Sequence, residues 1–373
     1  MIDTSGLPMI EKGNCVEWDH PNIYSLFSYY NHQEGTIMEG LSLKRVFLLV
    51  GVICLSLMLA GCWMDPVTVD PNLRSGLYNS SVNKPLGSWI APDGFMEDNY
   101  YFPITRDTNN NLYGLTRNTL GSNTVRFYSK QPGNEWSYSS LSGEFQNADW
   151  MDITVDSSGK VHGSFLDLSG DYGLYYLTNA TGTLTTYKIS TGTSYATRIG
   201  ADESGNLHIT ATNVLDSVLK HYWTLASVWQ NEVVGDGYFG VAHAMATGPG
   251  NAVHVALINA TDSTLVYSIK SAGLWQSQVV SNNPYLSFFL GIGIAVKSNG
   301  IPQIAYYSRD SILLFATKSG ASSWSIETVD TSLQAGYNGL SLKLGTNETP
   351  WITYLTNSRN NIRLAHKTAS GWS

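Results

Sequence analysis

One pattern recurs six times along this 373-residue chain: TRDTNNNLYGLT (105–116), TVDSSGKVHGSF (154–165), GADESGNLHITA (200–211), ATGPGNAVHVAL (246–257), AVKSNGIPQIAY (295–306) and KLGTNETPWITY (343–354). In each copy, Asp, Asn or Gly residues separate two runs of alternating apolar residues, which is the chemistry of a β-hairpin. The copies follow one another at intervals of about 47 residues, within the range of propeller blades. The repeat therefore predicts one structural unit per copy.

The segments between the copies supply further strands. A third run such as TLVYSIK (264–270) follows each hairpin, then a polar turn and usually a tryptophan that opens a fourth run, as in WSIETV (324–329). Each repeat thus provides four strands with a period of two residues. We expect the residues at the tryptophan position to pack between neighbouring units: Trp136, Leu184, Trp229, Trp275, Trp324 and Trp372.

These repeats predict an all-β fold, a β-propeller of six four-stranded blades over residues 80–373. The chain ends at Ser373, so the sixth blade is expected to lack its outer strand. The segment GSWIAPDG (87–94) lies about one repeat before Trp136 and is predicted to supply that strand, closing the ring. Residues 71–88 could form a degenerate seventh blade, which is the alternative to the favoured six. A linear solenoid is a further alternative, but the split last repeat argues against it.

The composition agrees with a fold of many short strands and argues against one class of binding partner. Charged residues make up only 13%, whereas Gly, Tyr and Trp number 35, 22 and 11. The net charge is −8, and no basic cluster follows Lys44-Arg45, which argues against a nucleic-acid partner. The three cysteines are Cys15, Cys54 and Cys62, so the propeller would contain no disulfide.

A second signal lies upstream of the repeats. From Met38, a basic pair precedes an apolar run from Val46 to Ala60, which is the layout of a signal peptide over residues 38–61. Its last four residues, LAGC (59–62), resemble a bacterial lipobox. The resemblance implies an exported lipoprotein held in the membrane through an acylated, palmitate-bearing Cys62. An uncleaved transmembrane anchor is the alternative, but the run is shorter than the roughly 20 residues that a spanning helix needs.

The lipoprotein reading divides the rest of the N-terminal region. Residues 1–37 are interpreted as an upstream segment from a mis-assigned start codon, and residues 62–79 as a lipidated tether. The predicted location is the bacterial cell envelope, on the outer membrane if the source is Gram-negative. Trp63 is compatible with that transfer, because an Asp there would have resembled an inner-membrane retention signal.

Over residues 75–373 the chain resembles the broad group of bacterial propellers that includes the sialidase and BNR-repeat proteins. The Asp-box signature of that group, Ser-x-Asp-x-Gly-x-x-Trp, does not occur; its nearest approximations are DSSG (156–159) and DESG (202–205). The resemblance therefore implies a fold and does not imply sialidase activity.

Candidate binding residues come from the innermost strands and from aromatics that precede them. Asp152, Arg198 and His243 align there and are predicted to form a polar pocket at the central channel. An aromatic position recurs just before them, and aromatic faces stack on sugars. Packing between blades is the alternative for at least half of these rings. The predicted ligand-binding residues are Trp150, Asp152, Tyr195, Arg198, Tyr238, His243, Tyr337 and Asn338.

Other constellations are assigned structural roles. His162, His208 and His254 recur at one hairpin position, too far apart on a six-bladed ring to share an ion, and each is expected to bond to a neighbouring turn. The Asp-rich turns lack a full calcium-loop ladder. The sequence predicts no metal or cofactor and assigns no catalytic residue.

Together, these features predict a cell-envelope lipoprotein whose propeller binds a glycan or an envelope protein. Two alternatives remain open: a glycan-active hydrolase or lyase with its site at the channel mouth, and a structural scaffold in an envelope complex. A binding module needs an aromatic rim, an enzyme needs a perturbed carboxyl or histidine in a pocket, and a scaffold needs a broad apolar patch.

Overall fold

In the computed structural model, 24 strands form six antiparallel sheets of four, and each sheet pairs its strands in chain order. The predicted signal peptide, Cys62, the tether and the segment 87–94 lie outside the residues that the structure describes. Within the described part of the chain, no helix has the length and apolar character to cross a membrane. The described residues are 103–118, 124–141, 145, 147–213, 215–225, 228–236, 240–259, 261–285, 291–331, 339–355 and 362–373.

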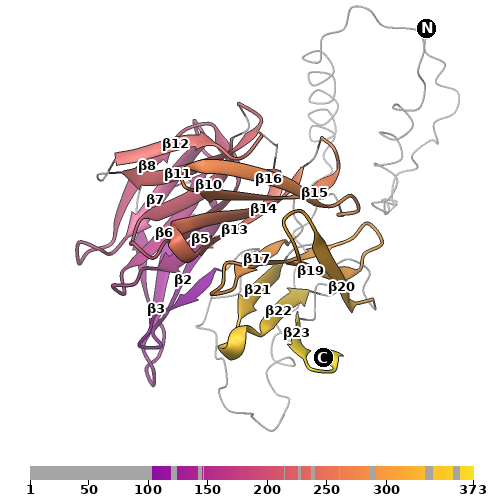
Figure 1. Cartoon of the computed structure of the whole chain (residues 1–373). Helices are drawn as coiled ribbons and strands as arrows, with labels where there is room; N and C mark the ends of the chain where they lie inside the picture. Colours follow the sequence, from indigo (N-terminus) through magenta and orange to yellow (C-terminus); the bar gives the residue numbers. More distant parts are fainter. Residues whose placement is uncertain are drawn as a thin grey trace, which may run out of the picture. The chain divides into compact units, whose positions relative to one another are not determined.

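The first three sheets follow the first three copies of the repeat, and we number them blades 1 to 3 (Figure 1). Their strands are β1 (Ile104–Arg106), β2 (Leu112–Asn118), β3 (Thr124–Lys130) and β4 (Ser137–Leu141); β5 (Ala148–Val155), β6 (Val161–Asp167), β7 (Gly173–Thr178) and β8 (Thr185–Ser190); β9 (Thr193–Ala201), β10 (Leu207–Asn213), β11 (Val218–Leu225) and β12 (Val228–Val233).

Blades 4 to 6 complete the set, with short 3₁₀ turns at Pro249–Asn251 and Thr346–Glu348. Their strands are β13 (Gly240–Gly248), β14 (Ala252–Asn259), β15 (Thr264–Ser271) and β16 (Leu274–Ser281); β17 (Gly293–Val296), β18 (Pro302–Tyr307), β19 (Leu313–Lys318) and β20 (Trp324–Asp330); β21 (Leu340–Leu344), β22 (Pro350–Leu355), β23 (Ile362–Thr368) and β24 (Gly371–Trp372).

The turn residues of the repeat explain the first hairpin of each blade. Gly159 and Gly205 both have φ of 79°, and Asn110 has φ of 64°, at the same place in three blades. Glycine reaches this left-handed region without a steric penalty, and Asn tolerates it better than most residues. The first strands of consecutive blades, from β1 through β5, β9, β13 and β17 to β21, then pack against one another. The predicted six-bladed, four-stranded propeller is confirmed.

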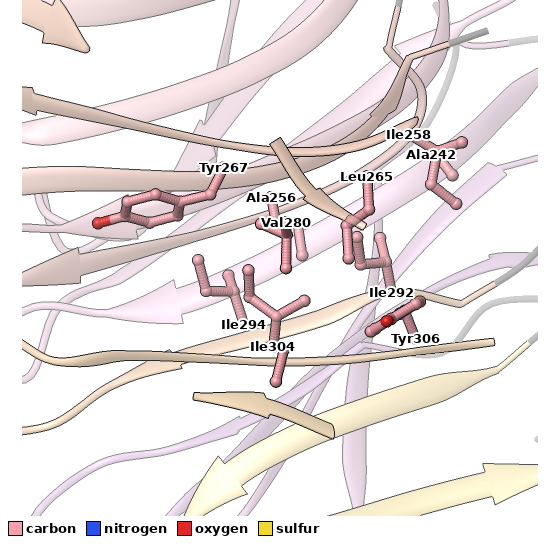
Figure 2. Packing of buried hydrophobic residues seen from close by; sticks show 12 residues of the cluster. Ala242, Ala256, Ile258, Leu265, Tyr267, Val280, Ile292, Ile294, Ile304 and Tyr306 are labelled. Atoms are coloured by element: carbon pink, nitrogen blue, oxygen red, sulfur yellow. The ribbon is translucent and has the colours of Figure 1, made fainter. Parts of the chain in front are cut away.

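The core lies between blades. Every residue of β6, β10, β14 and β18 is buried, because a neighbouring blade covers each face of these strands. Figure 2 shows one such layer, in which Ala256, Leu265 and Tyr267 of blade 4 meet Ile294 and Ile304 of blade 5. Apolar area removed from water in this way supplies most of the stabilisation of the fold.

The recurring tryptophans take the predicted packing role. Those of blades 3 to 6 insert beside a ring on the third strand of the preceding blade: Trp229 lies 5.2 Å from Tyr176, and Trp324 lies 5.3 Å from Tyr267, both between ring centroids and edge to face. Trp372 and Phe315 repeat the contact at 4.9 Å. Trp136 of blade 1 lies 6.4 Å from Tyr128 of its own blade. Such aromatic pairs add to stability beyond the area that they bury.

Blade 6 departs from the others. The chain itself supplies a fourth strand, β24, but only two residues long, so the expectation that this strand would be missing altogether is wrong. The second strand, β22, alternates buried and exposed residues, unlike its equivalents in blades 2 to 5. On its exposed side, Trp351 keeps 38% of its surface in solvent, and Leu364 of β23 keeps 55%. One face of this blade is therefore open within the described residues.

Candidate functional site

A cavity of about 290 Å³ lies where the first strands of the six blades converge. We call it the central cavity. Three of the described residues that line it carry charged side chains, and most of the apolar ones bury their side chains in the packing between blades. The lining residues are Pro103, Met151, Asp152, Arg198, Ala244, Met245, Ile292, Gly293, Ile294, Gly339, Leu340, Ser341, Leu342 and Lys343.

Two β-bulges aim the predicted pair of charged residues into this cavity. The register of β5 against β6 shifts between Asp149 and Asp152, and Trp150 inside the shift has φ of 50°. The equivalent shift in β9 contains Ala196, with φ of 39°. Left-handed backbone is costly for residues with a Cβ and persists where the surroundings enforce it, often beside functional sites. Each bulge precedes its charged residue, Asp152 or Arg198, by two positions.

Asp152 is held firmly. Oδ1 accepts a hydrogen bond from its neighbour Ile153 N at 3.0 Å, and Oδ2 accepts one from Ile199 N on the next blade at 2.9 Å. Protein atoms crowd the carboxylate although part of the residue stays open to the cavity, and this desolvation raises its pKa. Arg198, the two backbone N–H groups and Lys343 oppose that rise.

Arg198 and Lys343 supply the positive charges. One guanidinium nitrogen of Arg198 donates to Thr197 O at 2.7 Å. Lys343 is exposed at the edge of the cavity, two positions after Ser341 on β21. Lys343 was not among the residues predicted from the sequence, although alternation along a strand places residues i and i+2 on one face and identifies it. With Asp152 ionised, the charged lining residues sum to +1.

His243 does not reach the central cavity. The pairing of β13 with β14 puts Ala244 opposite Ala256, at the position that Asp152 and Arg198 occupy in their blades, and His243 is the neighbouring residue, whose side chain points to the other face of the strand. The imidazole of His243 is 0% exposed, and its Nε2–H donates to Thr210 O at 3.3 Å. Burial, and then the charge of Arg198, lower the pKa of His243 to about 3.

The predicted aromatic rim is only partly visible. Trp150 and Tyr195 meet edge to face, with ring centroids 6.5 Å apart. Trp150 also packs against the buried cluster between blades 2 and 3, so its contacts are those of a core residue. Tyr238, Tyr337 and Asn338 lie outside the described residues.

The recurring histidines bond to turns, as predicted, in two of the three blades. His162 Nε2 lies 3.1 Å from Asp156 Oδ2, and His208 Nε2 lies 3.2 Å from Asp202 Oδ2. Oδ1 of each aspartate accepts two backbone N–H groups of its own turn. In blade 4, His254 Nδ1 instead lies 2.7 Å from the hydroxyl oxygen of Tyr267.

In blade 3 this motif extends into a chain toward blade 4. His208 Nδ1 lies 3.0 Å from His221 Nε2, and His221 Nδ1 lies 2.9 Å from Glu232 Oε1, which also accepts from Lys270 and Trp275. Burial lowers the pKa of His221 to about 4, and the surrounding donors lower that of Glu232 to about 2. The chain has three contacts, Asp202–His208, His208–His221 and His221–Glu232, but two neutral imidazoles carry only two N–H protons. One of the three contacts therefore lacks a proton at neutral pH.

A second cavity, of about 360 Å³, lies beside the turns that follow the first strands of blades 2 to 5. Asp156 and Asp202 line it, but their carboxylates are already bonded to turn N–H groups and to histidines. Ser157 and Lys297 also line it and serve below as control positions.

Comparison with known proteins adds information on the fold. No protein-family model matches the sequence, and no curated protein matches it either. Among solved structures, the chain is similar to the fucose-recognising lectin of Aleuria aurantia, a six-bladed β-propeller, at 13% identity, covering 74% of this chain and 94% of the lectin, with a TM-score of 0.52.

Two further structures have the same likeness. AofleA from Arthrobotrys oligospora is 11% identical, covers 73% of this chain and 84% of its own, and gives a TM-score of 0.51. A protein of unknown function from Dyadobacter fermentans is 9% identical, covers 72% and 93%, and gives 0.52. At these identities the likeness establishes the architecture, a six-bladed β-propeller.

Proposed function

We propose that this chain is an exported lipoprotein, anchored through Cys62, whose propeller binds a glycan in the central cavity. The observation that carries the binding role is the pair of bulges that bring Asp152 and Arg198 to one cavity from adjacent blades. Left-handed backbone at Trp150 and Ala196 is unfavourable for residues with a Cβ, and strain of this kind is typical of sites where a side chain must be placed.

The chemistry of the cavity supports a small polar ligand. Its volume lies near the lower end of the roughly 300–1,000 Å³ range of ligand pockets, which suits one sugar residue better than a folded partner. Asp152, Arg198 and Lys343 line the cavity and supply hydrogen-bond donors and acceptors for sugar hydroxyls. That the solved structures of similar fold include fucose-binding lectins adds support for a glycan.

A glycan array probed with the full chain, purified in mild detergent, tests this function. Ser341 is exposed and lines the cavity, so Ser341→Trp would fill the space without disturbing the core. Ser157→Trp, at the second cavity, is the matched control. We expect binding by the wild type and the control and loss of binding by Ser341→Trp. An array with no signal from the folded wild type would overturn the proposal, and cleavage of an arrayed glycan would favour the enzyme alternative.

The lipid anchor is tested separately. Expression with labelled palmitate should label the wild type and leave Cys62→Ser unlabelled and processed differently. Equal labelling of both forms would refute anchoring through this cysteine. The result is independent of what the propeller binds.

A further inference from the structure

The central cavity holds more positive charge than its own carboxylate can neutralise. Among the described lining residues, Arg198 and Lys343 carry positive charges and Asp152 carries the single negative charge. Elsewhere in the described chain, several basic side chains form ion pairs, as Lys188 does with Asp171 at 2.7 Å and Arg363 with Asp330 at 2.8 Å, and others lie over aromatic rings, as Arg126 does over Tyr138. In a chain of net charge −8, an excess of cations in a cavity is a local exception.

Asp152 does not pair directly with either cation. Both of its oxygens accept backbone N–H groups, from Ile153 and Ile199, and no ion pair joins it to Arg198 or Lys343 within 4.0 Å among the described side chains. Arg198 places one nitrogen on Thr197 O, which leaves further N–H donors of its guanidinium for a ligand. Asp152 therefore positions the strands while Arg198 keeps its binding capacity.

The surroundings of these cations favour an anion. Arg198 is half-buried at the cavity, and a charge-assisted hydrogen bond to its guanidinium is stronger there than in open water. A guanidinium presents a planar fork that matches a carboxylate in a bidentate way. Because the lining charges sum to +1, a monoanion balances them, whereas a phosphate monoester would leave an excess of negative charge near Asp152.

On the basis of the proposed glycan-binding function, we propose that the ligand is an acidic sugar whose carboxylate binds Arg198, with Lys343 adding attraction at the edge of the cavity. The class of ligand is a terminal hexuronic acid or an equivalent sugar acid. Its ring occupies the apolar part of the cavity, and its carboxylate replaces the water that would otherwise solvate Arg198.

The test compares sugars that differ only in this group. Binding of the full chain to glucuronate-terminated, glucuronate methyl ester-terminated and glucose-terminated glycans is measured by surface plasmon resonance at low and high salt. We expect the acid to bind at least about tenfold more tightly than the ester or the neutral sugar, as charge-assisted hydrogen bonds imply. Added salt should weaken binding of the acid more than that of glucose.

Variants that remove a positive charge and a variant that removes the negative charge have opposite expected effects on affinity, which distinguishes loss of recognition from misfolding. Arg198→Gln should lose at least about tenfold in affinity for the acid and Lys343→Gln a smaller factor, while Lys297→Gln at the second cavity should bind as the wild type does. Asp152→Asn removes the negative charge and should bind the acid more tightly, which a variant that fails to fold cannot do. Equal binding of acid and ester, blocked by Ser341→Trp, would overturn this inference and leave the proposed function intact. Absence of binding to any glycan would overturn both.

Discussion

His243 offers a quantitative test of the packing between blades 3 and 4. Its imidazole is fully buried, its Nδ1 has no hydrogen-bond partner among the described residues, and its pKa is lowered from 6.5 to about 3. The unfolded chain takes up a proton at this residue below about pH 6.5, whereas the folded protein does not until about pH 3. The neutral form thus contributes stability above pH 6.5 that is lost as the pH falls toward 3.

The magnitude follows from the two pKa values. At pH 5, about 1.5 pH units below the pKa of His243 in the unfolded chain, preferential protonation of the unfolded state lowers the free energy of unfolding by about 2 kcal/mol. His243→Leu removes the titrating group. We therefore expect the free energy of unfolding of the variant to rise by about 2 kcal/mol relative to the wild type when the pH is lowered from 7.5 to 5, whatever the difference at pH 7.5.

Urea unfolding of both proteins, followed by tryptophan fluorescence at the two pH values, measures this change. Leu257 pairs directly with His243 across β13 and β14, so Leu257→Ala is a matched control that weakens the same sheet without removing a titratable group. Its stability should run parallel to that of the wild type. If the His243→Leu curve also runs parallel, the imidazole is not held neutral by burial and the reasoning fails.

Three further changes test the fold at other points. A Cβ at Gly293 would lie 2.8 Å from Leu342 Cβ on the next blade, so Gly293→Ala should cost about 1–3 kcal/mol in urea unfolding. A cost below about 0.5 kcal/mol, the usual size of a surface effect, would contradict this close approach. Asp202→Asn leaves the turn and imidazole N–H donors short of an acceptor and should cost about 1–3 kcal/mol of stability. The control Asp216→Asn, at an exposed ion pair, should cost roughly 0–1 kcal/mol. Equal costs would argue against a stabilising role of the buried motif. Trp229→Leu should lower stability by about 2 kcal/mol or more in thermal unfolding, and an unchanged midpoint would show that the ring does not hold blades 2 and 3 together.

The repeat and its strand count were predictable because hairpin chemistry and period-two alternation are local properties of the sequence. His243 was expected in the cavity because it was aligned one residue out of step: Asp152 and Arg198 each lie two residues before their copies of the repeat, whereas His243 lies three before its copy. Neighbouring residues of a strand point to opposite faces, so a slip of one position changes the face. Asp152 and Arg198 both line the central cavity. Lys343 was not predicted, although alternation along β21 places it on the same face as Ser341.

The open face of blade 6 bears on the order in which the molecule assembles and comes apart. Synthesis proceeds from the N-terminus, so blade 6 is completed after the other five, and its Trp351 and Leu364 stay exposed on one face. The last blade to fold therefore gains little stability from burying apolar surface on this face. Amide protons of β22 and β23 should exchange with solvent ahead of those in β10 and β14, and proteases should find their first cleavage sites at this end of the propeller.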